Sequence, residues 1–473
     1  MLHRTMLAAA AVATLCSAAV PSLAAELPVH VDPRVEAVGI VCRLAGYDEW
    51  KKPTIASYDG AAMRWFAPQA AHPAVALART LRAERGIAYN APVGLALALD
   101  PVTFEPLVPL WPRPGFLDAR WDSASAYGFA AALRAFARDA RLAEFLAAQQ
   151  ADVAAVEREF DRRLGSALDL DWFRRVYGFG EGTRLTVVPA LFSREGNYGA
   201  HVVLGDGTFI AYQVLAVPSA RRASDLHLSG DGLFGLAAHE LSHPFVNPWV
   251  DAHLDQLLPS GRTLFAATES EMRANAYGAP EVLLYETVVR AQAIRWAREH
   301  GHGALAKAMA AEDRRRAFAW TGELADTLAA AGRLDAAAAP RVAACLATWA
   351  SEARARLEQS RANDAAAAAE AARTGPQVTR LVPANGATDV AAGEGVLEIA
   401  FDREMNGAVS LMGDTPEVIG APTWNAGHTV FSVRVRFDSG RTYVLGLNSP
   451  ADLGFRSKAG EALTPREWRF TVK

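Results

Sequence analysis

The residues best suited to do chemistry form the run His239-Glu240-Leu241-Ser242-His243. The apolar residues 233–238 precede this run and predict that it lies on a helix. Positions four apart on a helix point to the same side, so both imidazoles can reach one metal ion. The pattern predicts a zinc site, with Glu240 beside the metal as the general base that takes a proton from metal-bound water. The alternative is a helix with two surface histidines, which the apolar run disfavours.

A catalytic zinc normally has three protein ligands, so one more must come from elsewhere in the chain. In one class of zinc peptidase a third histidine follows the motif, but Trp249 stands at that position here. In another class a glutamate ligand follows at a short spacing, but that spacing leads to Thr263, which is not acidic. The next acidic residues downstream are Glu269, Glu271, Glu281 and Glu286. Glu286 is the predicted ligand, because it lies in an apolar helical run where a carboxylate needs a positive partner. A metal would satisfy it, and so would an ion pair with Arg290 one turn on.

Substrate-binding residues are expected upstream of the motif. Asn197, Tyr198 and Gly199 lead into the strand-like residues 200–204. An edge strand beside a zinc site can pair with an extended peptide, although an ordinary sheet strand would give the same pattern.

Charge that develops on the attacked carbonyl needs a donor besides the metal. Tyr277, Tyr285 and His253 are the candidates, and Tyr277 is favoured as a catalytic residue because it precedes the helix of the proposed ligand. Arg290 is expected either to bond a carboxylate oxygen beside the metal or to bind substrate.

The elements around these residues can be read from hydrophobic spacing. A helix is expected from Pro33, where Asp32 is a suitable N-cap, and further helices are expected over residues 123–175. Short apolar runs between residues 184 and 217 predict a small sheet with a hairpin. Helices return over residues 232–372. Pro244 lacks the N–H that would bond to the carbonyl of Glu240, so the motif helix should kink or stop at His243.

The C-terminal residues have a different pattern. Residues 363–376 form an alanine-rich helix end and a linker, after which apolar and polar residues alternate. Leu397, Ile399 and Phe401 lie on one face of a predicted strand, and residues 431–437, 443–447 and 468–472 predict further strands. Residues 377–473 therefore predict an immunoglobulin-like β-sandwich, and residues 381–405 resemble the Ig-like modules appended to secreted bacterial proteins.

The N-terminal residues predict export. Residues 1–25 combine a basic start, a short apolar run and small residues, which is typical of a signal peptide, so we expect a secreted or periplasmic protein without a transmembrane segment. After cleavage two cysteines remain, Cys42 and Cys345, and a bridge between them is left open. The 48 basic and 52 acidic residues give a net charge of -4, which argues against a nucleic-acid partner.

Three separated motifs resemble one bacterial family, the domain of unknown function 4932. They are His239–Pro248, the opening Val31–Glu36 with Arg43–Tyr47, and Glu286–Ala291. The resemblance covers about Val31 to Arg298. Pro244 departs from the family pattern, which puts the geometry of the motif helix in doubt.

The family is similar to gluzincin-type metallopeptidases. The resemblance therefore implies an α+β fold in which residues 26–362 form a mainly helical, zincin-like domain with a small sheet. The expected function is a secreted zinc metallopeptidase that acts on peptides or proteins. The Ig-like tail would be a spacer, or an attachment module for a cell-surface polymer or protein. The alternative is a non-catalytic binding or adhesion protein on the same scaffold.

Overall fold

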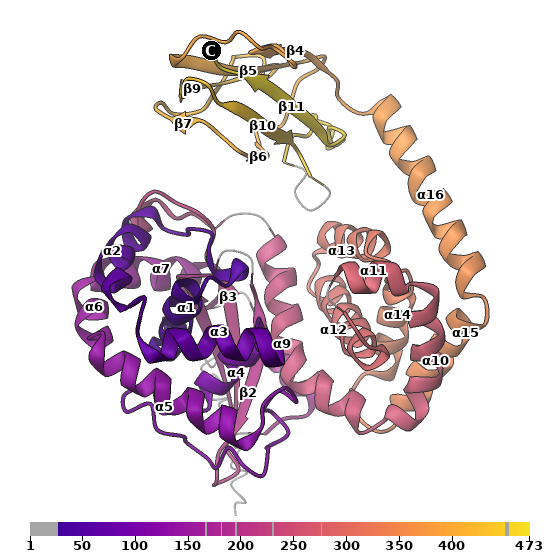
Figure 1. Ribbon diagram of the computed structural model, residues 1–473. Coiled ribbons are helices and arrows are strands. Elements are labelled where there is room, and N and C mark those ends of the chain that lie inside the picture. Colours follow the sequence, from indigo (N-terminus) through magenta and orange to yellow (C-terminus); the bar gives the residue numbers. More distant parts are fainter. Residues whose placement is uncertain are drawn as a thin grey trace, which may run out of the picture.

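The computed structural model describes residues 27–165, 168–180, 182–193, 196–228, 231–275, 277–449 and 454–473. The chain mixes many helices with small sheets, so the predicted α+β class is confirmed (Figure 1). The expected signal peptide, residues 1–25, lies outside the described residues. Within those residues, no helix combines the length and the apolarity that crossing a bilayer would require.

The first helix, α1 (Pro33–Ala45), begins where the sequence predicts. Asp32 accepts a hydrogen bond from the N–H of Arg34, and Pro33 occupies the first turn. Gly46 ends the helix with φ of 89°, a left-handed conformation that favours glycine. The helices that follow, in chain order, are α2 (Ala56–Phe66), α3 (Pro73–Arg85), α4 (Asn90–Leu97), α5 (Ser123–Asp139), α6 (Leu142–Ala148), α7 (Gln150–Phe160) and α8 (Leu170–Tyr177).

The predicted small sheet is confirmed. It contains β1 (Thr183–Ala190), β2 (Tyr198–Val203) and β3 (Phe209–Ala216) in the order β1-β3-β2. β1 runs parallel to β3, and β2 pairs with β3 as an antiparallel hairpin in which Gly199 faces Gln213. β2 is therefore an edge strand.

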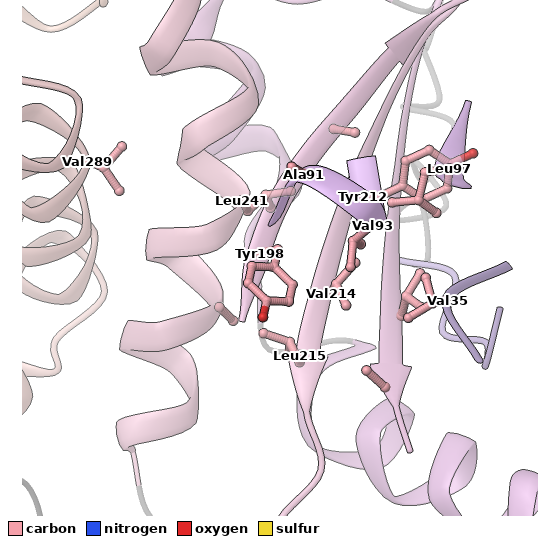
Figure 2. Close-up of a cluster of buried hydrophobic side chains, with 14 of the residues drawn as sticks. Val35, Ala91, Val93, Leu97, Tyr198, Tyr212, Val214, Leu215, Leu241 and Val289 are labelled. Atoms are coloured by element: carbon pink, nitrogen blue, oxygen red, sulfur yellow. The ribbon is translucent and has the colours of Figure 1, made fainter. Parts of the chain in front are cut away.

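Helices cover the sheet on two sides (Figure 2). Val35 of α1 and Val93 and Leu97 of α4 pack toward the sheet from one side, and Leu241 packs from the other. Leu241 belongs to α9 (Gly232–Asp251), the helix that carries the histidine motif. The sheet thus fixes the position of the motif helix.

The motif helix does not stop at His243. It continues through Pro244 and Pro248 to Asp251, so of the two expected outcomes, a kink or a stop at His243, the stop is excluded. Pro244 still leaves the carbonyl of Glu240 without its helical partner. Packing of α9 against both the sheet and α12 (Pro280–Glu299) holds the helical conformation across this defect, because helices in proteins owe most of their stability to such contacts.

The remaining helices form a bundle around α12. They are α10 (Leu254–Ala267), α11 (Glu269–Ala274), α13 (Gly303–Arg315), α14 (Thr321–Ala331), α15 (Ala339–Ser351) and α16 (Ala353–Thr374). α12 contacts α9, α10, α13 and α14. It is consequently the helix through which the bundle reaches the motif.

α16 connects the bundle to the C-terminal strands (Figure 1). Residues 363–374, expected to be the end of a helix and the start of a linker, are helical throughout. Asp364 pairs with Arg314 of α13 at 2.9 Å. At the other end, Arg403 donates to the carbonyl of Thr374 at 3.0 Å and Gln377 donates to that of Ala372 at 2.8 Å. The connection is therefore a capped helix and not an irregular linker.

The C-terminal strands enclose a second hydrophobic core, separate from the first. One sheet has the order β11-β10-β6, and the other has the order β4-β5-β9-β7 with β8 beside β9. Their bounds are β4 (Val378–Val382), β5 (Gly393–Phe401), β6 (Leu411–Gly413), β7 (Glu417–Val418), β8 (Thr423–Trp424), β9 (Val430–Phe437), β10 (Thr442–Leu447) and β11 (Arg466–Thr471). Leu397, Ile399 and Phe401 are buried on one face of β5, as their alternation predicts.

The two cysteines of the described chain are both free. Cys42 is fully buried in α1, where it packs as a small apolar side chain, and Cys345 is partly buried in α15. The structure contains no bridge between them.

Glu36 is a buried carboxylic acid where α1 meets the sheet. Its Oε2 accepts a hydrogen bond from the Tyr58 hydroxyl at 2.7 Å, and its Oε1 accepts one from the Leu191 N–H at 2.9 Å. Burial, opposed by these two hydrogen bonds, raises the pKa of Glu36 to about 7. The folded protein therefore holds a proton on Glu36 at pH values where the unfolded chain has lost it.

Replacing Glu36 with Gln is expected to flatten the dependence of stability on pH. The carboxyl stabilises the fold fully below its unfolded pKa of 4.5, and this stabilisation disappears as pH rises through about 7. The loss is at most about 3 kcal/mol. Urea unfolding between about pH 5 and about pH 8 should show falling stability for the native chain and a smaller fall for E36Q. Equal slopes for the two proteins would contradict a raised pKa.

Candidate metal centre

Two imidazoles of α9 point at one location. The Nε2 atoms of His239 and His243 are 3.2 Å apart, as expected for residues one helical turn from each other. Two ring nitrogens at this distance repel each other through their lone pairs unless a proton or a cation lies between them. The arrangement is satisfied by an N–H···N hydrogen bond between neutral rings or by a cation bound to both.

Glu286 of α12 completes the group. Its Oε2 lies 3.7 Å from His239 Nε2, and its Oε1 lies 3.6 Å from His243 Nε2. Zinc–nitrogen and zinc–oxygen bonds of about 2.0–2.1 Å in a tetrahedral site place ligand atoms about 3.3–3.4 Å apart. The three separations, 3.2, 3.6 and 3.7 Å, are close to those edges. These atoms could hold one tetrahedral metal ion.

The protonation states suit a metal. Burial lowers the pKa of His239 to about 3, so its imidazole is neutral. Burial alone would raise the pKa of Glu286, but the charge of Arg290 outweighs it together with the two histidines, and the pKa falls to about 2. Glu286 Oε2 is buried without a hydrogen bond from any described residue. A neutral imidazole, an ionised carboxylate and an unsatisfied oxygen are what a cation would bind.

Asn247 orients His243, a role that the sequence analysis did not assign. Its Oδ1 lies 3.2 Å from His243 Nδ1 and accepts the ring proton, which leaves the lone pair on Nε2. Asn247 follows His243 by one helical turn, so the spacing alone could have indicated it.

Tyr277 and Arg290 surround Glu286 from the other side. Arg290 Nη2 donates to the Tyr277 hydroxyl at 3.1 Å, and the charge of Glu286 contributes to the raised pKa of Tyr277 after burial, the largest cause. Arg290 Nε lies 3.2 Å from Glu286 Oε2, so the ion pair considered from the sequence exists alongside the histidines. Arg290 is itself only 11% exposed, which favours its role beside the carboxylate over contact with substrate.

Glu240 lies next to the two histidines but on the side of the sheet. Its carboxylate is within 4.8 Å of both imidazole groups, and Gly199 of β2 packs against the backbone of Glu240. Burial raises the pKa of Glu240 to about 7. A carboxyl group in this position can exchange a proton with a group held at the metal position.

Gly199 brings the edge strand β2 against the motif helix. A Cβ at this position would lie 2.2 Å from the Glu240 carbonyl oxygen and 2.7 Å from His243 Cβ. That carbonyl is the one that Pro244 leaves without a helical partner. Only glycine allows the strand to approach so closely.

The other two residues predicted to bind substrate have structural contacts. Asn197 Oδ1 accepts a hydrogen bond from the Ala216 N–H at 2.8 Å and so holds the ends of β2 and β3 together. Tyr198 is buried against Trp50, with ring centroids 6.5 Å apart. Of the three predicted residues, Gly199 is the one that touches the motif.

The other residues considered as the third ligand or as the donor to the carbonyl have different partners. Glu269 pairs with Arg273 in α11, and Glu271 pairs with Arg361 of α16. Tyr285 donates to Asp251 at the C-terminal end of α9. His253, just beyond that end, bonds the Trp249 carbonyl at 2.7 Å.

A family described as "Domain of unknown function (DUF4932)" matches residues 119–332. The match includes α9 and α12 and covers somewhat less than half of the chain. It begins well after the opening motif near Asp32, on which the resemblance partly rested. No curated protein matches the chain.

Several solved structures align with the chain at low similarity. CopC from Methylosinus trichosporium OB3b is 14% identical, with a TM-score of 0.17, over 21% of this chain and 93% of that one. The surface layer protein SbsC, domains 1–6, is 13% identical, with a TM-score of 0.14, over 54% of this chain and 34% of that chain. The S-layer protein rSbsC(31-844) is 14% identical, with a TM-score of 0.15, over 50% of this chain and 33% of that chain. The chain thus spans about a third of the two S-layer proteins.

Replacing Gly199 with Ala is expected to separate β2 from α9 and to weaken metal binding. The added methyl group would overlap the Glu240 carbonyl and His243 Cβ, neither of which can move without shifting the helix backbone. A destabilisation of about 1–3 kcal/mol should appear in thermal unfolding, with weaker zinc binding by chelator competition. Gly205→Ala in the same hairpin is the control, since a Cβ there meets nothing within 4 Å. Identical behaviour of the two variants would rule out the close contact.

Proposed function

We propose that the protein is a zinc metallopeptidase of the gluzincin type, with His239, His243 and Glu286 as metal ligands. The observation that carries the proposal is the triangle of ligand atoms with edges of 3.2, 3.6 and 3.7 Å. Nitrogen and carboxylate donors in this arrangement suit zinc, and three protein ligands leave one position open, as in catalytic sites.

The chain's own residues would carry the proton transfers. Zinc, when bound, would supply a polarised water molecule and an electrophile for the scissile carbonyl. Glu240 would accept the proton of that water at its carboxylate and return it to the leaving amine. Gly199, which packs against the Glu240 backbone, would keep β2 beside this residue during both transfers. Tyr277 would either donate to the attacked carbonyl or help to position Glu286. Its hydrogen bond from Arg290, which pairs with Glu286, favours the second role.

β2 would be the strand that receives substrate. It is an edge of its sheet and touches the motif helix at Gly199, so an extended peptide added to this edge would run past the metal position. We propose peptides or proteins as the substrate class on this basis.

The C-terminal strands would form an immunoglobulin-like β-sandwich. Two antiparallel sheets around one core, with buried and exposed residues alternating along β5 and β9, support that assignment. In an exported protein such a module would be a spacer, or would bind a cell-surface polymer or protein.

The alternative, a binding protein without activity, rested on damage by Pro244. The helix continues through this residue and His243 still lies 3.2 Å from His239, which favours the catalytic proposal.

Glu240→Gln is expected to abolish peptide hydrolysis and to leave zinc bound, because Glu240 is placed as a base and not as a ligand. Zinc content by mass spectrometry and cleavage of an unbiased peptide library would measure the two properties. Full cleavage by the variant would exclude Glu240 as the base. A zinc-loaded native protein that cleaves no peptide would favour the binding protein.

Glu286→Gln is expected to weaken zinc binding by about 100-fold or more. Loss of a residue that only hydrogen-bonds a ligand typically weakens binding by about 10–100-fold, and loss of a ligand should cost more. Chelator competition on the folded variants would measure this. Glu281→Gln and Glu269→Gln are the matched controls and should keep the native affinity. Strong loss in either control, with E286Q unchanged, would move the third ligand away from Glu286.

A further inference from the structure

The end of α13 is built around Arg290. Ala317 follows the helix with φ of 65°, a left-handed conformation that is costly for alanine. The N–H of Phe318 donates to the Asp313 carbonyl at 2.7 Å, and the N–H of Ala317 donates to that of Arg314 at 3.0 Å. These two bonds form a Schellman motif, which fixes Asp313 and Phe318 relative to each other.

Both fixed residues contact the Arg290 guanidinium. Arg290 Nη1 donates to Asp313 Oδ1 at 2.7 Å, and the guanidinium carbon lies 4.7 Å from the centre of the Phe318 ring. The second oxygen of Asp313 accepts a hydrogen bond from the Thr321 hydroxyl at 2.9 Å. Asp313 is 4% exposed and lies outside the proposed ligand set.

The three nitrogens of the Arg290 guanidinium face three different residues. Its Nη1 bonds Asp313 and its Nη2 bonds Tyr277, whereas its Nε lies 3.2 Å from Glu286 Oε2 without hydrogen-bond geometry. Arginine and a carboxylate usually form a bidentate pair with two parallel hydrogen bonds. Such a pair would occupy both oxygens of Glu286, and here it is not formed.

We propose that Asp313 is a positioning residue for the metal centre. Its bond to Nη1 excludes an end-on pair of Arg290 with Glu286 through Nη1 and Nη2, while Tyr277 holds the Nη2 that a side-on pair through Nε and Nη2 would need. Glu286 Oε2, which lies 3.2 Å from Arg290 Nε without a hydrogen bond, then remains available to a cation. The inference rests on the proposed function, because it concerns the affinity of the same ligand set.

Asp313→Asn tests the role. The variant should leave Arg290 free to turn onto Glu286, and the zinc dissociation constant of the folded protein should rise about 10–100-fold, as for outer partners of metal ligands. A crystal structure of the metal-free variant should show two hydrogen bonds of about 2.7–2.9 Å between Arg290 and Glu286. Asp326→Asn is the matched control, because Asp326 pairs with Arg298 at an exposed position of α14 and should leave zinc affinity unchanged.

The Arg290→Met background separates positioning from a general effect on the fold. Without the guanidinium, Asp313→Asn should change the zinc dissociation constant less than about twofold, because the two residues act as one unit. In D313N alone the buried Arg290 guanidinium loses its carboxylate partner, which can prevent folding. The double variant has no guanidinium at this position, so it can be measured if D313N alone does not fold. An equal effect of D313N in both backgrounds would overturn the proposal, and so would native zinc affinity in folded D313N.

The two proposals can fail separately. Native protein that binds zinc, with D313N binding it equally well, removes the role of Asp313 and leaves the metal centre intact. If the native protein binds no zinc, the proposed function fails, and the metal-free structure of D313N still decides whether Asp313 keeps Arg290 from Glu286. An unchanged Arg290 in that structure would overturn the positioning role.

Discussion

Glu286 carries a negative charge in the interior between α9 and α12, and the surrounding elements are arranged to balance it. An unpaired carboxylate at this depth would take up a proton, so the site depends on positive charge nearby. Arg290 supplies that charge from one side, and the two imidazoles stand on the other. Because α12 contacts four other helices, the position of this single side chain links the bundle to the sheet.

The histidine motif and its third partner could be predicted because their signals are local or nearly so. His239 and His243 are one turn apart, and Glu286 stands out as an acidic residue in an apolar helical run. Asp313 could not be found in this way. It is 23 residues from Arg290, and nothing in its own neighbourhood distinguishes it from an exposed acidic residue at the end of a helix. Its burial follows from how α13 packs, which is a tertiary property.

Tertiary contacts and residue propensity also decide how far the helices extend. Proline at 244 is a strong local reason to end a helix, but contacts on both sides of α9 outweigh it. Residues 363–376 were predicted to be a helix end followed by a linker, and the helix runs to Thr374, which the high helix propensity of alanine favours. The strands of the C-terminal part were found because alternation along a half-buried sheet survives without any knowledge of its neighbours.

The helical connection also has a mechanical consequence. Beyond the ion pair of Asp364, ten residues of α16 continue to Thr374, which at 1.5 Å per residue is a rise of about 15 Å. A flexible linker of the same length would sample a broad range of separations, whereas a helix anchored by an ion pair at Asp364 and bonded at its C-terminal end keeps a nearly fixed length. Any surface held by the C-terminal strands would thus be presented to the rest of the molecule at a nearly fixed reach, with a correspondingly narrow range of effective concentrations.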